Sequence, residues 1–346
     1  MYEPIGPKIR NKLSLLATNA SSAEVRSWIK PGNVHRTNDF PDTTYKDFLS
    51  AVYESKKSWE DLYTRLYEDY MDPKRNLGRY YVDFLNNAVS RMNTAQTGGN
   101  VLLGHYMLMG PLYITSAFAY HQHVNSNKEF WDFNERILSQ STFEDTIELY
   151  KAINSANPGG LGKIGEYDLT SENFESELAE DNINLLKIFE ISAERDTISA
   201  ELSSNYQFIR TTALPKLVKL TDEYGDGIAR FTSIFSRKLI NRDIIQVSPK
   251  FNELVMRLFL FILGSKPDTL IIRKTDLATA TEISRKSMRL FDDFYTLDSG
   301  IWFGQVDKFD QDLQTNSGLT NPGTTADLLA TSIFLYFVKQ DLDRSK

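Results

Sequence analysis

Apolar side chains recur at three- and four-residue spacing along most of the chain, and the strict alternation typical of half-buried strands is scarce. The segment 177–209 shows this spacing in six apolar residues: Leu185, Leu186, Ile188, Phe189, Ile191 and Ile198. The same spacing predicts helices at 45–69, 78–93, 101–121, 129–138, 142–154, 215–224, 228–242, 250–263, 275–295 and 326–342. Because helical segments dominate so heavily, we predict an all-α fold, a large single-domain helical bundle.

The organisation of the chain favours one domain over residues 1–346. A length of 346 residues would allow two domains, but no repeat of fixed period, low-complexity tract or Pro- or Ser-rich linker divides the sequence. The acidic stretch 165–181 is the best candidate for a mobile loop.

Composition and charge narrow the classes of function. The chain has no cysteine, which excludes disulfides, thiolate catalysis, zinc fingers and iron–sulfur clusters. A formal net charge of -7 argues against a general nucleic-acid coat, although it allows a local basic pocket. The N-terminus lacks the apolar core of a secretory signal, and the longest apolar stretches, 258–263 and 328–338, are far shorter than the about 20 residues that cross a bilayer. We therefore expect a cytoplasmic protein without a membrane or nucleic-acid partner.

Four turns with glycine or Pro-Gly stand just ahead of a helical pattern, at 30–36, 97–100, 157–163 and 321–327. Glycine lets a ligand approach the backbone, and the N-terminus of a helix offers free N–H groups at a positive dipole end. Any helical protein needs turns, so one such turn carries little meaning. Three of the four adjoin Lys or hydroxyl residues, and as a set they indicate phosphate binding.

Several well-known motifs are absent. A P-loop would need glycine at Asn157 and a hydroxyl residue at Ile164, so Gly-Lys at 162–163 is no Walker A motif. The chain has neither His-Glu-x-x-His nor Gly-x-Ser-x-Gly, which leaves zinc hydrolase and serine hydrolase chemistry without support. Asp292 and Asp293 resemble the aspartate-rich motif of isoprenoid synthases, but Thr296 fills its last position, and a surface pair is the better interpretation.

Three carboxylates and one basic pair are candidates for the chemistry. Asp196 and Glu201 are five residues apart on a predicted helix, about 140° around it, so they are no tight pair, yet either could line a cavity. A carboxylate there would bind Mg²⁺ or accept a proton, and the alternative is a solvated side chain. Asp327 follows the last turn, where it could also simply complement the helix dipole. Arg273 and Lys274 could clamp an anionic substrate or form a solvated helix end.

Taken in order, these motifs resemble the triphosphoribosyl-dephospho-CoA synthase family, in the branch found widely in archaea. The residues that carry the resemblance are Glu24, 30–36, Asp39, Phe40, 98–100, Leu103, Gly104, 157–162, Asp196, 267–271, Arg273, Lys274 and 321–328. Each motif alone is weak, but the ordered set is fairly specific and spans residues 24 to 338.

The resemblance implies an all-α transferase that uses ATP as a ribosyl donor. The family joins the triphosphoribosyl unit of ATP to the 2′-hydroxyl of dephospho-CoA and releases adenine. Its product is the precursor of the prosthetic group of citrate lyase and malonate decarboxylase. The partners expected are ATP and dephospho-CoA, or a related small molecule, and the question of a homo-oligomer is left open.

The demands of that chemistry assign roles to the candidate residues. Cations would bind the phosphates: Lys30, His35, Arg36, Lys163, Arg273 and Lys274. Carboxylates would hold Mg²⁺ or act as the catalytic base: Asp196, Glu201 and Asp327. Amides and hydroxyls would donate hydrogen bonds to the substrates: Asn33, Asn100, Thr324 and Thr325.

One position departs from the family pattern. Val101 and Leu102 follow Asn100, where the family usually has a Thr-His pair. Two alternatives therefore stand beside the family reaction: a related ribosyl or phosphoribosyl transferase with another acceptor, and a nucleotide-binding relative without catalysis.

Overall fold

The structure is a computed structural model that describes residues 5–159, 166–224, 248–316 and 318–345. These residues form fifteen α-helices and one π-helical turn. Within the described ranges there is no β-strand, and the isolated bridge between His35 and Asn38 stands alone. The predicted all-α fold is confirmed, while the predicted helix 228–242 lies outside the described residues.

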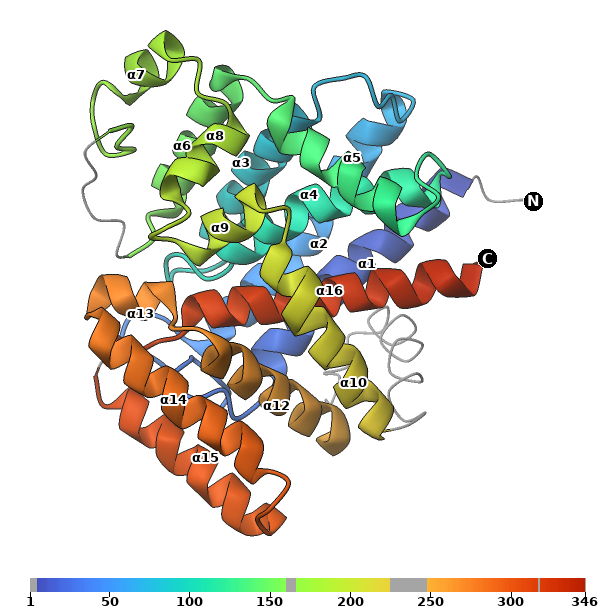
Figure 1. Cartoon of the computed structure of the whole chain (residues 1–346). Helices are drawn as coiled ribbons and strands as arrows, with labels where there is room; N and C mark the ends of the chain where they lie inside the picture. The colour runs from blue at the N-terminus through green and yellow to red at the C-terminus, as the bar shows by residue number, and fades with distance from the viewer. Residues whose placement is uncertain (1–4, 160–165, 225–247, 317, 346) are drawn as a thin grey trace.

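The helices follow one another along the whole chain (Figure 1). Their bounds are α1 (Ile5–Arg26), α2 (Tyr45–Glu68), α3 (Leu77–Ala95), α4 (Leu103–Tyr120), α5 (Asn127–Ser139), α6 (Phe143–Ala156), α7 (Phe174–Glu180), α8 (Leu185–Ser192), α9 (Thr197–Ser203), η1 (Ile209–Ala213, the π-helical turn), α10 (Leu214–Tyr224), α12 (Pro249–Ser265), α13 (Thr269–Lys274), α14 (Leu277–Asp293), α15 (Ser299–Gln314) and α16 (Gly323–Ser345).

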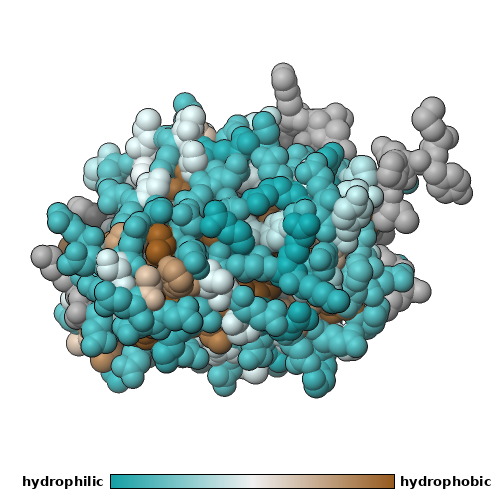
Figure 2. Space-filling view, turned by 90° about the horizontal axis from the view of Figure 1, so that it is seen from above, coloured by the Kyte–Doolittle hydropathy of each residue, from teal (hydrophilic) through white to brown (hydrophobic). Residues whose placement is uncertain are grey.

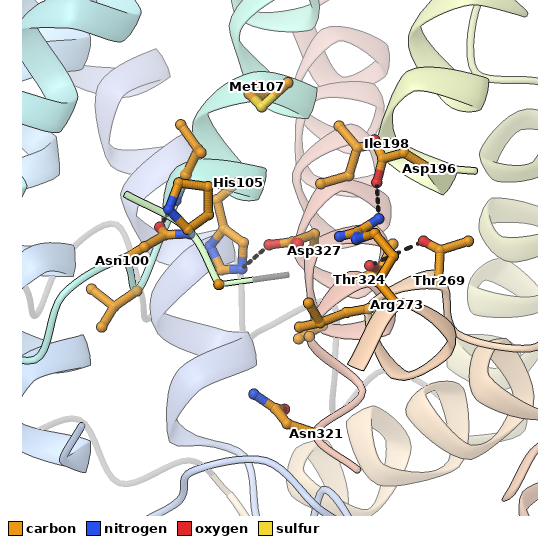
Figure 3. Close-up of a pocket in the computed structure, with 18 of the residues that line it drawn as sticks. Asn100, His105, Met107, Asp196, Ile198, Thr269, Arg273, Asn321, Thr324 and Asp327 are labelled. Atoms are coloured by element: carbon orange, nitrogen blue, oxygen red, sulfur yellow. Dashed lines mark hydrogen bonds and ion pairs between the residues drawn. The ribbon is translucent and has the colours of Figure 1, made fainter. Parts of the chain in front are cut away.

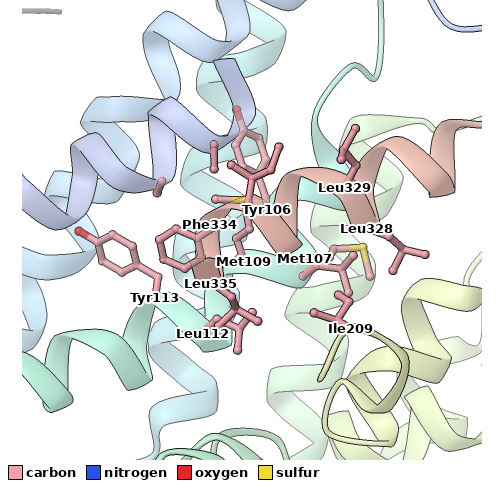
Figure 4. Packing of buried hydrophobic residues seen from close by; sticks show 14 of the residues in the cluster. Tyr106, Met107, Met109, Leu112, Tyr113, Ile209, Leu328, Leu329, Phe334 and Leu335 are labelled. Atoms are coloured by element: carbon pink, nitrogen blue, oxygen red, sulfur yellow. The ribbon is translucent and has the colours of Figure 1, made fainter. Parts of the chain in front are cut away.

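Helices α4 and α16 form the centre of the molecule. Every residue of α4 from Leu103 to Phe118 is buried, as expected of a helix that is surrounded on all sides. Figure 4 shows its side chains packed against α16, and the rings of Tyr113 and Phe334 stack with centroids 6.5 Å apart. In Figure 1, α16 crosses the middle of the molecule and begins between α9 and α13. This arrangement places the first turns of α4 and α16 at the same cavity.

A proline inside α4 is accommodated by a tyrosine from α3. Pro111 has no N–H, so the carbonyl of Met107, four residues earlier, loses its helical donor. The hydroxyl of Tyr81 donates to that carbonyl at 3.0 Å. The helix therefore continues through Pro111, as the spacing at 101–121 predicts.

The segment 177–209 differs from the uniform helical stretch that its apolar spacing suggests. Asn184 accepts a hydrogen bond from the Lys187 N–H and begins α8, and Asp196 accepts one from the Ser199 N–H and begins α9. Such side chains cap helix N-termini and so divide the segment. The acidic stretch before it contains α7, and its mobility stays a prediction.

Hydrophilic side chains cover most of the face seen in Figure 2, and hydrophobic ones appear there in small recesses. Among the described helices, none combines the length and the apolar character that a membrane span requires.

Candidate active site

A cavity of about 1200 Å³ opens where α4, α8, α9, α13 and the start of α16 meet. Its lining includes residues from all four glycine-containing turns: Lys30, Asn33, Gly98, Gly99, Asn100, Pro158, Gly159, Asn321 and Gly323. Small-molecule sites typically occupy about 300–1,000 Å³, so this cavity is large for a ligand site. Turns that are far apart in the sequence therefore converge on one candidate active site.

The lining of the cavity is both apolar and polar. Its apolar side chains come from α4, α6, α8 and α9: Met107, Leu149, Ile153, Ile188, Phe189 and Ile198. In Figure 3, Met107 and Ile198 lie on one side of Asp327, and Asn321 lies on the other. The site suits ligands that combine charged groups with an apolar part.

An ion pair forms the floor of the cavity. Lys30 Nζ lies 3.1 Å from Glu24 Oε1, and both side chains are buried. Burial raises the pKa of Glu24, and the Lys30 ammonium opposes that shift. Because a buried charge without a partner is costly, Lys30 and Glu24 depend on each other.

His105, in the first turn of α4, stands between two carboxylates. Its Nε2 lies 3.7 Å from Glu24 Oε2 and 3.6 Å from Asp327 Oδ1, and its Nδ1 lies 3.1 Å from Ser21 Oγ. Burial, with the nearby Lys30 ammonium, lowers the pKa of His105 to about 3. The imidazole is therefore neutral at physiological pH.

Asp327 presents its carboxylate to the cavity from one turn inside α16, and its side chain keeps 18% exposure. A Cβ on Gly104 would overlap this carboxylate, so the position of the carboxylate against α4 depends on glycine there. Burial raises the pKa of Asp327 well above its usual range, and the neighbouring carboxylates Glu24, Asp268 and Asp196 add to the rise. A raised pKa in a cavity is typical of proton-transfer groups.

Asp268 ties the beginnings of α13 and α16 together. Its Oδ1 accepts from the Leu270 N–H at 2.8 Å, and its Oδ2 accepts from the Thr325 N–H at 2.7 Å and the Thr325 hydroxyl at 2.8 Å. The carboxylate is buried, and burial raises its pKa while the Thr325 hydrogen bonds oppose the rise. This contact sets Thr324, which lines the cavity, beside Thr269 with their hydroxyl oxygens 3.4 Å apart.

Two cations of α13 reach the cavity. Arg273 Nη1 donates to Asp196 Oδ1 at 2.8 Å, which joins the C-terminal end of α13 to the start of α9 (Figure 3). Lys274 Nζ donates to the Gly318 carbonyl at 3.1 Å, and burial lowers the pKa of Lys274. Both cations contact groups that a phosphate could replace.

Comparison with known proteins identifies the family. The family described as ATP:dephospho-CoA triphosphoribosyl transferase (CitG) matches residues 10–242 and 221–346. The chain belongs to this family. A crystal structure from Archaeoglobus fulgidus, assigned as a triphosphoribosyl-dephospho-CoA synthase, has a similar fold with a TM-score of 0.53 and 19% identity, covering 83% of this chain and 96% of that chain. No curated protein matches the chain.

The family confirms the resemblance that the sequence motifs indicated, and with it the prediction of an enzyme. The activity of the family is triphosphoribosyl transfer from ATP to dephospho-CoA, and this is the function of the chain. The alternative of a non-catalytic binder is not favoured. Val101 and Leu102 stand where the family usually has a Thr-His pair. Val101 lines the cavity, and Leu102 is buried in the core.

Most of the residues that the sequence assigned to this transferase site do line the cavity. They are Lys30, Asn33, Asn100, Asp196, Arg273, Lys274, Thr324 and Asp327. Asn33 Nδ2 is buried without a partner, and Asn100 Oδ1 accepts from the Leu103 N–H at 3.1 Å. Asn33 therefore retains a free donor at the wall of the cavity.

Glu201 does not line the cavity, contrary to its assignment as base or metal ligand. Its carboxylate accepts hydrogen bonds from the backbone N–H groups of Phe208, at 3.1 Å, and Ile209, at 2.9 Å. Burial raises the pKa of Glu201, and these N–H groups oppose the rise. Glu201 thus stabilises the start of η1.

Three phosphate or hydrogen-bond assignments also fall on residues with other contacts. His35 Nε2 pairs with Asp310 Oδ2 at 2.9 Å, and the guanidinium of Arg36 lies 5.3 Å from the centroid of the Trp28 ring. The Thr325 hydroxyl donates to Asp268, as described above. None of these three lines the cavity, and Lys163 lies outside the described residues.

Two of the three predicted metal ligands reach the cavity, and the third does not. In the part of the chain that the structure describes, no three His, Asp or Glu side chains are grouped to hold a metal ion. Asp196 and Asp327 both line the cavity, but Glu201 does not.

Sequence reasoning gave no role to Glu24, His105 and Asp268, although all three organise the site. Glu24 and Asp268 belong to the residues that carry the family resemblance, and that membership is the sequence feature that could have indicated a role for them. His105 directly follows Gly104 of the matched set, but its partners are remote in the sequence.

Proposed function

We propose that this cavity transfers the triphosphoribosyl group of ATP to the 2′-hydroxyl of dephospho-CoA, with Asp327 as the proton-transfer group. The observation that supports it is the meeting of Asp327 with the phosphate-type cations Arg273 and Lys274 in one cavity. Both nucleotides belong to the cytoplasm, so we propose that compartment.

The reaction makes one bond and breaks another at the anomeric carbon of the ATP ribose. The bond from this carbon to N9 of adenine breaks, and its electron pair leaves with adenine, which takes up a proton. The 2′-oxygen of the acceptor bonds to the same carbon, and its hydroxyl proton passes to the ionised carboxylate of Asp327. Because positive charge develops on the ribose, an anionic carboxylate nearby also stabilises the transition state.

The triphosphate is not altered, so the protein only has to bind it. Arg273 exchanges its contact with Asp196 for a phosphate oxygen, and Lys274 supplies a second cation. Thr324 and Asn33 donate hydrogen bonds at the same wall. These groups hold the ribose of ATP in a fixed orientation toward the acceptor.

The donor set fits a magnesium ion that arrives with the triphosphate. Mg²⁺ in such sites takes about one or two carboxylates together with phosphate oxygens and water, so a three-carboxylate cluster is not required. Asp196 lines the cavity beside Arg273 and would hold the ion. When bound, Mg²⁺ neutralises part of the charge of the triphosphate.

Adenine release tests the proposal. Purified protein is incubated with ATP, Mg²⁺ and dephospho-CoA, and we expect free adenine by chromatography and a triphosphoribosyl adduct of dephospho-CoA by mass spectrometry. Asp327→Asn should lower the rate by about 10²–10⁴-fold, the usual contribution of a catalytic base. ATP binding by calorimetry without adenine release would favour the non-catalytic binder. Adenine release only with a different acceptor would assign another transfer reaction.

A further inference from the structure

We infer that His105 and Glu24 act together as positioning residues that set the direction and the ionisation of Asp327. The inference rests on the proposed function, because it assigns work to the proton-transfer group named there. The three residues come from three helices, α1, α4 and α16, so they share no local structural reason to be adjacent.

The geometry puts the imidazole between the two carboxylates. His105 Nε2 lies 3.7 Å from Glu24 Oε2 and 3.6 Å from Asp327 Oδ1, slightly beyond hydrogen-bond distance from each. Figure 3 shows His105 and Asp327 directed toward one another in the cavity. Because Gly104 has no Cβ, the Asp327 carboxylate can lie this close to the first turn of α4 and to the imidazole.

The surroundings of the imidazole fix its tautomer. Nε2 faces two carboxylates, which are acceptors, so the proton of the neutral ring belongs on Nε2. Nδ1 then accepts from the hydroxyl of Ser21, 3.1 Å away. His105 thus offers one N–H to Asp327 without adding a charge.

The charges around Asp327 have opposing effects on its ionisation. Glu24, Asp268 and Asp196 disfavour the ionised form, and the guanidinium of Arg273 favours it. Glu24 itself is paired with Lys30. The negative charge of Glu24 therefore raises the pKa of Asp327. From the geometry we expect the Nε2–H of His105, whose nitrogen lies 3.6 Å from Asp327 Oδ1, to favour the ionised carboxylate and so to oppose that rise.

This balance predicts opposite shifts in the pH profile of kcat/KM. The base works when ionised, so the acid limb of the profile follows the pKa of Asp327. His105→Phe removes the N–H donor and should move the acid limb to higher pH, by about one unit, which costs about tenfold in rate on that limb. Glu24→Gln removes the negative charge and should move the limb to lower pH.

Three further variants separate positioning from loss of structure. His105→Gln carries an N–H that can reach the place of Nε2 and should restore the limb toward the wild-type position. Ser21→Ala removes the hydroxyl that keeps the ring proton on Nε2, but it leaves the imidazole in place. It should therefore move the acid limb to higher pH by less than His105→Phe does. His123→Gln is the control, because His123 is exposed and lies beyond Tyr120, the last residue of α4, which is about 22 Å along the helix from His105. Its profile should match the wild type.

ATP affinity, measured by calorimetry over the same pH range, supplies a second readout. An ionised Asp327 repels the triphosphate, so affinity should fall as pH rises through the pKa of Asp327, with the same opposite shifts in the two variants. If the wild type bound ATP but released no adenine, the proposed function would fail and this readout alone would decide the inference. A pH dependence unchanged in His105→Phe, or shifted in the same direction by His105→Phe and Glu24→Gln, would overturn it.

Discussion

Gly104 lies so close to Asp327 that even a methyl side chain at position 104 would displace the carboxylate. The backbone of Gly104 touches the carboxylate of Asp327, and an added Cβ would occupy the space of that carboxylate. Asp327 lies one turn inside α16 and Gly104 lies in the first turn of α4, so this contact is made where the two central helices meet the cavity. The cavity depends at this point on the absence of a side chain.

Gly104→Ala should therefore inactivate the enzyme while the fold is kept. Displacing a catalytic group by about 1 Å can cost about 100-fold in rate, so we expect adenine release to fall by that order. Gly304→Ala in α15 is the matched control, because its added Cβ meets nothing within 4 Å. Equal adenine release in the two variants would show that Asp327 tolerates displacement.

The raised pKa of Asp327 makes a prediction about stability and pH. In the unfolded chain this carboxyl ionises near its ordinary pKa, while in the folded protein it ionises at a higher pH. Folding stability is therefore lost as pH rises from the unfolded to the folded pKa, and it stays reduced above that. Asp327→Asn mimics the protonated form, so its Tm should equal that of the wild type at acid pH and exceed it at neutral pH. A lower Tm at neutral pH would contradict this.

At the scale of elements, Asp268 serves two helices at once. It caps α13 through the Leu270 and Ile271 N–H groups and binds Thr325 in the first turn of α16. These helices carry Arg273, Lys274 and Asp327 into the cavity. One buried carboxylate thus positions the cationic and the acidic parts of the site together.

Asp268→Ala should lower both stability and activity. It removes a helix cap and leaves buried N–H groups without partners, a loss of about 2–4 kcal/mol in the free energy of unfolding measured with urea. Asp298→Ala is the control: Asp298 caps α15 by accepting from the Gly300 N–H at 2.9 Å and does not line the cavity. It should cost about 1 kcal/mol and leave adenine release unchanged.

Local spacing predicted most of the long helices, and among those that it missed, α1 and α15 show the physical reason. In α1, every residue from Leu13 to Val25 is buried, and many are Ser, Ala or Thr, so no apolar stripe appears. In α15, the buried stripe of Trp302 and Val306 is interrupted by Gly304, which disfavours a helix. Apolar spacing thus fails where small polar residues make up a buried helix, as in α1, or where a glycine interrupts the pattern, as in α15.

The whole molecule places residues from distant parts of the chain in one cavity. The four glycine-containing turns could be found in the sequence because their composition is unusual, and they do converge. The contact of Glu24, His105 and Asp327 could not be found, because it depends on how α1, α4 and α16 pack. Glu201 was misplaced for the same reason: its carboxylate faces the backbone of η1 and not the cavity.

Because the cavity joins segments from residue 24 to residue 327, ATP should stabilise the whole fold. A ligand at about 100 times its Kd adds about 2.7 kcal/mol to the free energy of unfolding. Urea unfolding with and without ATP and Mg²⁺ measures this, and Arg273→Ala should reduce the gain at the same ATP concentration. A transition that ATP leaves unchanged at saturation would show that ATP binds away from these segments.

The contact between Arg273 and Asp196 has a consequence for turnover. In the resting enzyme the guanidinium already holds an anion of its own chain, so binding ATP is an exchange of one anionic partner for another. Such an exchange yields less net affinity than the capture of a phosphate by a free arginine. It also favours product release, because the Asp196 carboxylate competes with the product triphosphate for the guanidinium of Arg273. An enzyme whose product keeps the full triphosphate of its substrate gains from this a built-in route to release.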